Sequence, residues 1–181
     1  MNRMNCDLSA VLFDEYQIQT RVREIGSQIV SDYKDKTPVL IGILKGGFVF
    51  LADLCRAITI PVELDFLAIS SYGSQTSSSG VVKIRKDIDI DISGRDVIIV
   101  EDIVDSGLSL QYIKDYILKH APASLRTCVM LDKPKAHKLE VGFDYVGFEI
   151  GNEFVVGYGL DFNEKYRNLP YIGILKEELY L

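Results

Sequence analysis

The chain has 181 residues, a length that suits one domain, and no linker-like stretch divides it. Hydrophobic residues make up 48% and charged residues 25%, so a core can form without disulfides or metals. The net charge of −6 argues against a nucleic-acid partner, because proteins that hold nucleic acid usually present a basic surface.

Cysteine usage and the N-terminus indicate the compartment. Cys6, Cys55 and Cys128 are far apart and at no metal-ligand spacing, which predicts reduced structural thiols. The first nine residues lack the apolar run of a secretory signal. No stretch approaches the roughly 20 apolar residues of a membrane span. We therefore expect a cytoplasmic protein with no membrane partner.

The first part of the chain alternates helix and strand patterns. Apolar residues at helical spacing predict an amphipathic helix over residues 14–34. The nearly continuous apolar run 39–44 predicts a strand that is buried on both faces, as in a parallel sheet. A helix covering the sheet is predicted at residues 48–58, and the next strand at residues 62–69.

The middle of the chain combines a polar loop with a second strand and helix. Residues 70–80 hold six serines, two glycines and no aliphatic residue, so we expect a mobile loop before a return strand at residues 81–85. Residues 97–100 predict a buried strand, and residues 108–120 show helical spacing. Strand, polar loop and helix in this order form half of a βαβ unit.

The last part is rich in strand patterns. Residues 125–131 predict one more buried strand, and strand-like pieces follow at residues 145–150, 154–157 and 171–175. The whole chain therefore predicts one α/β domain, residues 1–181, with a parallel-sheet core flanked by helices. We expect that core over about residues 10–135 and a small β-rich extension over about residues 136–181, joined by the N-terminal segment.

Two adjacent carboxylates, Glu101 and Asp102, directly follow the apolar run 97–100. In open α/β sheets ligands bind beyond the carboxyl ends of the strands, so these acids are expected at a site. Carboxylates accept hydrogen bonds from sugar hydroxyls and hold Mg²⁺ directly or through water. Solvated loop residues are the plainer interpretation of either acid alone.

The next residues predict a phosphate cradle. Asp105, Ser106, Gly107 and Ser109 are small or polar and directly precede a predicted helix. Unpaired backbone N–H groups at a helix start hold phosphate well, the serines add hydroxyl donors, and the glycine permits a tight turn. A helix cap at Asp105 and a plain turn at Gly107 are the structural alternatives, but the complete run favours a ligand site.

Residues 97–109 resemble the phosphoribosyl-pyrophosphate signature of type I phosphoribosyltransferases, and the Glu-Asp form is similar to that of the hypoxanthine-guanine members. The resemblance covers roughly residues 10–178 and implies the fold of that family. Ser106 and Ser109 stand where many members have threonine and keep the hydroxyl. Leu108 stands where others carry lysine or asparagine, which leaves the role of this substrate-binding position open.

Two further segments match the family. Leu44-Lys45-Gly46-Gly47 resembles its pyrophosphate loop, in which the glycine amides approach the anion and the lysine adds charge. The peptide between Leu44 and Lys45 is often cis in the family. Taken alone, this segment is equally well explained as a strand-to-helix turn.

Ser71 and Tyr72 begin a polar segment that resembles the family's flexible lid over the substrate, although a surface loop has a similar composition. Lys133 matches the lysine that donates to the purine O6 atom. Without the resemblance, Lys133 is simply a surface lysine.

Residues 145–170 resemble the C-terminal hood of hypoxanthine-guanine phosphoribosyltransferases. The resemblance implies that Phe154 stacks on the base and that the backbone of Val155 reads the base edge. It also implies that Asp161 holds a second Mg²⁺ on the pyrophosphate and that Arg167 contacts the pyrophosphate. Without the family, Phe154 is a core residue.

The resemblance implies an enzyme of purine salvage. It would transfer the 5-phosphoribosyl group from phosphoribosyl pyrophosphate to N9 of hypoxanthine or guanine, with Mg²⁺, and give IMP or GMP and pyrophosphate. Lys45, Arg167 and Asp105 would act in catalysis, with Asp105 near N7 as general base or charge partner. Family members are usually homodimers or homotetramers.

Two other classes of protein deserve comparison. Some proteins with the phosphoribosyltransferase fold regulate by binding RNA or DNA, but these need a basic face or an added DNA-binding unit, and the net charge here is −6. A receiver domain that accepts a phosphoryl group also places acids and a lysine at strand ends. It needs its acid pair after the first strand, whereas Glu101 and Asp102 come past mid-chain.

Overall fold

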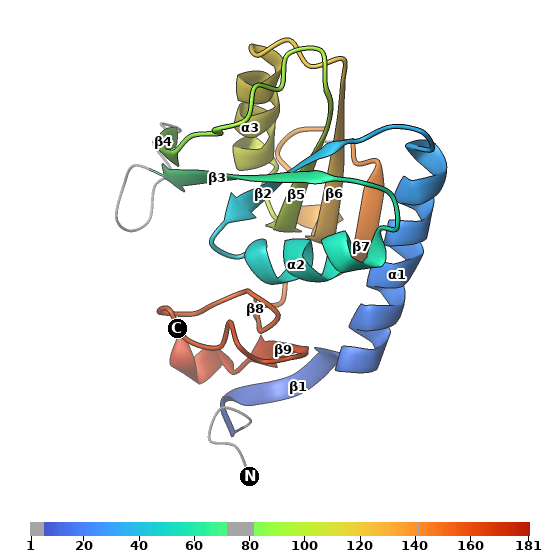
Figure 1. The fold of residues 1–181 in the computed structure, drawn as a ribbon. Helices are drawn as coiled ribbons and strands as arrows, with labels where there is room; N and C mark the ends of the chain where they lie inside the picture. Colours follow the sequence, from blue (N-terminus) through green and yellow to red (C-terminus); the bar gives the residue numbers. More distant parts are fainter. Residues whose placement is uncertain (1–5, 72–81, 141) are drawn as a thin grey trace.

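The computed structural model describes residues 6–71, 82–140 and 142–181. A six-stranded sheet forms its centre, and the strands are β2 (Val39–Leu44), β3 (Glu63–Ser71), β4 (Val82–Lys86), β5 (Asp96–Val104), β6 (Ser124–Asp132) and β7 (Tyr145–Glu149). Their order in space is β4-β3-β2-β5-β6-β7, and all pair in parallel except β4, which is antiparallel to β3 (Figure 1). This is the parallel-sheet core that the sequence predicts.

Helices cover both faces of this sheet. They are α1 (Glu15–Asp32), α2 (Phe48–Ala57) and α3 (Leu108–Leu118). The buried residues of α1 and α2 share one apolar core with Leu40 and Ile98, whereas those of α3 share a second core with Ile41 and Ile99. Successive side chains of a strand point to opposite faces, so strands buried on both sides need the continuous apolar runs found here.

A second sheet forms the hood below the first (Figure 1). It consists of β1 (Leu8–Phe13), β9 (Ile172–Leu175) and β8 (Val155–Val156), in this order and all antiparallel. Val155 and Ile172 are buried in the same apolar core as α1 and α2. The first strand of the chain and its C-terminal third therefore build one small layer that is packed against the main body.

The expected type of fold is confirmed, but two elements differ from their predictions. β5 continues to Val104, because β6 pairs with it as far as Asp132. The prediction that the strand stops before Glu101 and Asp102 was therefore wrong. β7 pairs in parallel with β6 and joins the central sheet, whereas the sequence placed residues 145–150 in the β-rich extension.

Two expectations concern segments outside this architecture. Most of the polar loop expected at residues 70–80 falls within residues 72–81, which lie outside the described residues, as does Tyr72. Among the helices of the described chain, none is long and apolar enough to cross a membrane.

A capping box fixes the start of α1. The Asp14 carboxylate accepts from the backbone N–H of Gln17 at 2.8 Å, and the Asp14 backbone N–H donates to the Gln17 side chain at 3.0 Å. These bonds satisfy two donors that an uncapped helix leaves free. The cap also marks the point where the chain leaves β1 in the hood and enters the main body.

We predict that Asp14→Ala lowers the free energy of unfolding by about 1 kcal/mol, because it removes an N-cap acceptor. Chemical denaturation would measure the change. Asp14→Asn is the matched control, since an amide oxygen also caps and should retain most of the stability. Equal losses in both variants would show that the carboxylate charge, rather than the cap bond, stabilises the helix start.

Candidate functional site

The two acids are adjacent near the carboxyl end of β5 but meet different neighbours. Glu101 lines the hollow in front of α3, and Asp102 lies against Gly46 in the loop between β2 and α2. Each carboxylate accepts a backbone N–H: Asp102 donates to Glu101 Oε1 at 3.3 Å, and Ile103 donates to Asp102 Oδ1 at 2.9 Å. The two acids thus serve two different parts of one site.

Burial makes both carboxylates harder to ionise. Burial raises the pKa of Glu101 well above its ordinary value, and the neighbouring charge of Asp102 raises it further. Burial also raises the pKa of Asp102, while its bond from Ile103 and the positive charge of Arg167 act in the opposite direction. Two buried carboxylates lower the stability of the folded state, and titratable groups perturbed in this way are typical of functional sites.

The glycine loop between β2 and α2 lies directly against Asp102. A Cβ atom on Gly46 would overlap the Asp102 carboxylate, and one on Gly47 would come within 2.8 Å of the carbonyl oxygen of Ile43. Both positions therefore require glycine for packing. The peptide between Leu44 and Lys45 is cis. This loop, which the sequence assigns to pyrophosphate, is brought to the acid pair.

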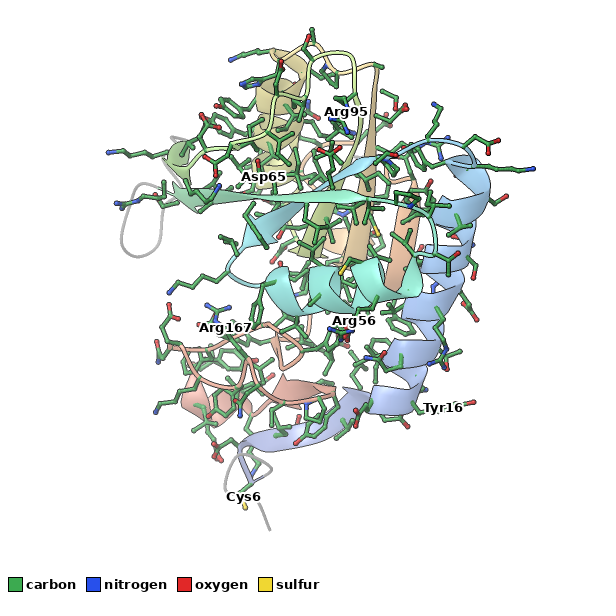
Figure 2. All side chains as sticks on the ribbon, viewed as in Figure 1. Cys6, Tyr16, Arg56, Asp65, Arg95 and Arg167 are labelled. Carbon is green, nitrogen blue, oxygen red and sulfur yellow. The ribbon has the colours of Figure 1, made fainter. Side chains whose placement is uncertain are left out.

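The hood meets the same loop from the other side. A Cβ atom on Gly159 would collide with the carbonyl oxygen of Gly46, and the φ of +100° at Gly159 is one that other residues rarely adopt. Arg167 donates to the carbonyl oxygen of Gly159 at 2.8 Å and lies on the side of the hood that faces α2 (Figure 2). The structure thus joins Arg167 to the loop of Lys45 and Gly46.

The predicted phosphate cradle is a small hollow of about 120 Å³ in front of α3. Glu101, Asp105, Ser106, Gly107 and Ser109 are among its lining residues. Gly107, with a φ of +80°, is the N-cap of α3, so Asp105 is not the helix cap. Gly107 has no side chain with which to cap α3, and the first N–H group, of Leu108, makes only a long bond of 3.5 Å to Ser106 Oγ, so the helix start can receive an anion. Leu108 is 39% exposed at this helix start.

Lys133 lies at the end of β6 beside the cradle. It is buried, and its backbone N–H donates to the carbonyl oxygen of Val104 at 3.0 Å. Lysines are rarely buried, which favours a specific role for this side chain. The segment after it is held by a contact between His137 Nε2 and the Asp132 carboxylate at 2.7 Å.

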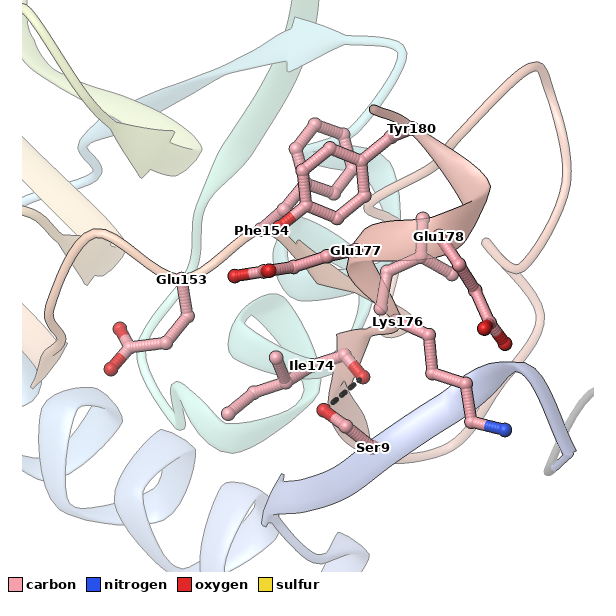
Figure 3. A pocket seen from close by; sticks show the side chains of 9 residues that line it. Ser9, Glu153, Phe154, Ile174, Lys176, Glu177, Glu178 and Tyr180 are labelled. Atoms are coloured by element: carbon pink, nitrogen blue, oxygen red, sulfur yellow. Dashed lines mark hydrogen bonds between the residues drawn. The ribbon is translucent and has the colours of Figure 1, made fainter.

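Phe154, the residue expected to stack on the base, contacts two other aromatic rings of the hood. Phe154 is half-buried and stacks on Tyr180, with ring centroids 4.9 Å apart and planes 25° apart. Its ring is nearly perpendicular to that of Phe162, with centroids 5.7 Å apart. Both stacked rings line a hollow of about 530 Å³ on the hood (Figure 3). Val155, the next residue, is buried and pairs with Ile174 in the hood sheet. Tyr180 was not singled out from the sequence.

One ion pair links the loop of Lys45 to the hood, and two more lie beside it within the hood. Lys45 Nζ lies 3.0 Å from Glu164 Oε1, and Arg167 Nη2 lies 2.8 Å from Asp161 Oδ1 and 3.4 Å from Glu164 Oε2. The sequence predicted roles for Lys45, Asp161 and Arg167 but none for Glu164. Its position in the segment that resembles the hood was the available signal.

The carboxylates suit a metal that is shared with a ligand. Among the described residues, no group of three or more histidine, cysteine or acidic side chains is placed to hold a metal ion. Glu101 and Asp102 form one pair, and Asp161 is bound to Arg167. Mg²⁺ at phosphate sites commonly takes one or two carboxylates and completes its shell with water and substrate oxygens, so this donor set fits it.

We predict that Glu101→Gln raises the free energy of unfolding by on the order of 1 kcal/mol at pH 7.5. Folding raises the pKa of Glu101 above its ordinary value of 4.5. Below that ordinary value the carboxyl is neutral in the folded and the unfolded state. As the pH rises from the ordinary pKa through the folded-state pKa, the folded state loses stability relative to the unfolded state. The gain should therefore disappear near pH 4. Urea denaturation at both pH values measures it, and a less stable variant at pH 7.5 would refute the argument.

Comparisons with known proteins identify the family. Residues 12–163 match the family model described as phosphoribosyl transferase domain. The chain is 48% identical over 177 residues to a hypoxanthine-guanine phosphoribosyltransferase of Bacillus subtilis, which covers 98% of each chain. It is 51% identical over 180 residues to the protein of that name from Mycobacterium tuberculosis, which covers 96% of this chain and 89% of that one.

Solved structures agree with these matches. A hypoxanthine phosphoribosyltransferase from Staphylococcus aureus superposes with a TM-score of 0.96 at 44% identity, covering 100% of this chain and 99% of that one. A hypoxanthine-guanine phosphoribosyltransferase from Bacillus anthracis gives a TM-score of 0.90 at 48% identity, covering 93% and 99%. The chain therefore belongs to the phosphoribosyltransferase family, among the hypoxanthine-guanine phosphoribosyltransferases.

Proposed function

We propose that this chain transfers the 5-phosphoribosyl group of phosphoribosyl pyrophosphate to N9 of hypoxanthine or guanine, which gives IMP or GMP and releases pyrophosphate. One observation carries the proposal: the cradle before α3 shares Glu101 with the acid pair, and Asp102 touches the glycine loop beneath the hood. Phosphoribosyl pyrophosphate presents three groups to these sites. Its 5-phosphate suits the cradle, its two hydroxyls suit the acid pair, and its pyrophosphate suits the glycine loop. The reaction would salvage purine bases.

The residues around the glycine loop would stabilise the departing pyrophosphate. Lys45 and Arg167 would supply positive charge, and the amides of Gly46 and Gly47 would supply donors, where negative charge develops as the bond to ribose breaks. The Gly47 amide donates to the carbonyl oxygen of Ile43 at 3.1 Å in this structure, so it would have to exchange that bond for one to the anion. Ser106, Gly107, Leu108 and Ser109 would hold the 5-phosphate through the start of α3. The main-chain groups of the glycine loop and of the start of α3 are held by the fold, so these donors would need little reorganisation during the reaction.

The acid pair would hold the ribose hydroxyls and Mg²⁺. Glu101 and Asp102 would accept hydrogen bonds from the two ribose hydroxyls. Together with water and substrate oxygens, they would also hold a Mg²⁺ ion near the ribose. Asp161 would hold a second Mg²⁺ ion near the pyrophosphate. Mg²⁺, when bound, neutralises charge on the leaving group. The carboxylate donor set described above supports this assignment.

The base would lie between the hood and the end of β5. Phe154 would stack on the purine, and the backbone of Val155 would read its edge. Lys133 would donate to O6, a role that its burial at the end of β6 beside the cradle supports. Adenine carries an amino group at this position and cannot accept that proton. Asp105, exposed at the rim of the cradle, would take the proton from N7 or balance its charge.

Three wider features belong to the proposal. Ser71 and Tyr72 would begin a lid that excludes water from the oxocarbenium-like ribosyl centre. Residues 1–181 would act as one domain with the hood over the site, and the active form would be a cytoplasmic homodimer or homotetramer.

The first test is pyrophosphate release from phosphoribosyl pyrophosphate and Mg²⁺, run separately with hypoxanthine, guanine, xanthine and adenine. We expect release with 6-oxopurines and none above background with adenine, because of the proton that Lys133 donates. The assay also ranks the 6-oxopurines. Binding of the sugar phosphate without release with any base would contradict the proposed enzyme and favour a regulatory role.

We predict that Asp105→Asn depresses turnover by about 10²-fold or more, the usual range for losing a general base, while affinity for the nucleotide product changes much less. Steady-state kinetics and product titration would separate the two effects. Ser109→Thr is the control for local disturbance, because it keeps the hydroxyl in the same cradle. Equal losses of turnover and product affinity in Asp105→Asn would remove the base assignment.

A further inference from the structure

Glu164 holds, with one carboxylate, the two cations that the proposed function assigns to pyrophosphate. Its Oε1 lies 3.0 Å from Lys45 Nζ, and its Oε2 lies 3.4 Å from Arg167 Nη2. Each carboxylate oxygen thus faces a different cation, as two oxygens of a phosphate would. We propose that Glu164 occupies the pyrophosphate position when no substrate is bound and competes with pyrophosphate for Lys45 and Arg167. The inference rests on the proposed function.

The turn that carries Glu164 is built to place this carboxylate. Asn163 and Glu164 both have positive φ, at 51° and 61°, which costs free energy for residues other than glycine. The backbone N–H of Glu164 donates to Asp161 Oδ2 at 2.9 Å, and Phe162 and Lys165 close the turn through paired backbone bonds. The chain therefore accepts an unfavourable backbone at the one position whose side chain bridges the hood to Lys45.

Arg167 retains unused donor capacity beside this carboxylate. Its Nη1 donates to the Gly159 carbonyl at 2.8 Å, and its Nη2 is shared between Asp161 and Glu164. Its Nε is buried and has no hydrogen-bond partner among the described residues. A buried unpaired donor is unfavourable, so an anion with more acceptor oxygens than a carboxylate would satisfy this guanidinium better.

The pair with Lys45 is weak enough to be displaced. The side chains of Lys45 and Glu164 are 67% and 66% exposed, and exposed ion pairs contribute little because water and salt screen them. The hydrogen bond from Lys45 lowers the pKa of Glu164, so the carboxylate stays charged at neutral pH. Glu164 therefore acts as a mild competitor, which sets pyrophosphate affinity without blocking the site and assists pyrophosphate release.

The decisive experiment is calorimetric titration of inorganic pyrophosphate, with Mg²⁺, into the wild-type protein and Glu164→Gln. The amide keeps the shape of the side chain and removes the charge. We expect Glu164→Gln to bind pyrophosphate about two- to fivefold more tightly, the range for losing an exposed ion pair. The KM for phosphoribosyl pyrophosphate should fall by a similar factor, and the KM for hypoxanthine should stay unchanged.

Two controls separate competition from a structural effect. Glu178→Gln removes the same charge from an exposed glutamate of the hood that forms no ion pair with a described residue, and it should leave pyrophosphate affinity unchanged. In a Lys45→Gln background, the gain from Glu164→Gln should shrink, because one of the two contested cations is gone.

Equal or weaker pyrophosphate binding by Glu164→Gln, while wild type binds, would overturn the inference and leave the proposed function intact. A structural role alone predicts that outcome together with a lower melting temperature. If the wild-type protein binds neither pyrophosphate nor phosphoribosyl pyrophosphate with Mg²⁺, the proposed function fails and the inference fails with it.

Discussion

The site depends on the contact between the backbone of Gly46 and the carboxylate of Asp102. A side chain on Gly46 would overlap this carboxylate, and one on Gly159 of the hood would overlap the carbonyl oxygen of Gly46. Three segments from distant parts of the sequence therefore meet at Gly46, whose main chain has no rotamer with which to move away. Close packing of this kind transmits position accurately. The hood sits over the carboxyl ends of β2 and β5 because of this contact and the apolar core that it shares with α1 and α2.

The acid pair illustrates how the fold accommodates an unfavourable group. Glu101 and Asp102 are adjacent in a central strand, where burial opposes the ionisation of both. The four residues before them, Val97 to Val100, are apolar and completely buried, and their hydrophobic contribution offsets this cost. A protein selected for stability alone would place apolar residues here. The unfavourable burial of Glu101 and Asp102 therefore indicates a functional position, independently of any ligand.

The charged side chains that join the hood to Lys45 are more exposed than the acid pair. Lys45, Glu164 and Asp161 are exposed or half-buried, and their ion pairs exchange readily with solvent ions. The carboxylates of β5 are fixed by backbone bonds and by the glycine loop. The site thus combines a rigid half, which would align the ribose, with an exchangeable half, which would admit and release the charged leaving group. This division suits a reaction in which an anion must both bind and depart.

The sequence alone determined the elements whose signals are local. The apolar run of β2, the spacing of α1, and the strand, small residues and helix around Gly107 each predict their structure from neighbours in the chain. Tertiary structure alone decided that β6 extends β5 past Glu101, that β7 joins the central sheet, that Tyr180 stacks on Phe154 and that Glu164 pairs with Lys45. The last two residues are 119 positions apart. No local pattern encodes such contacts, because they depend on how sheet and hood pack against each other.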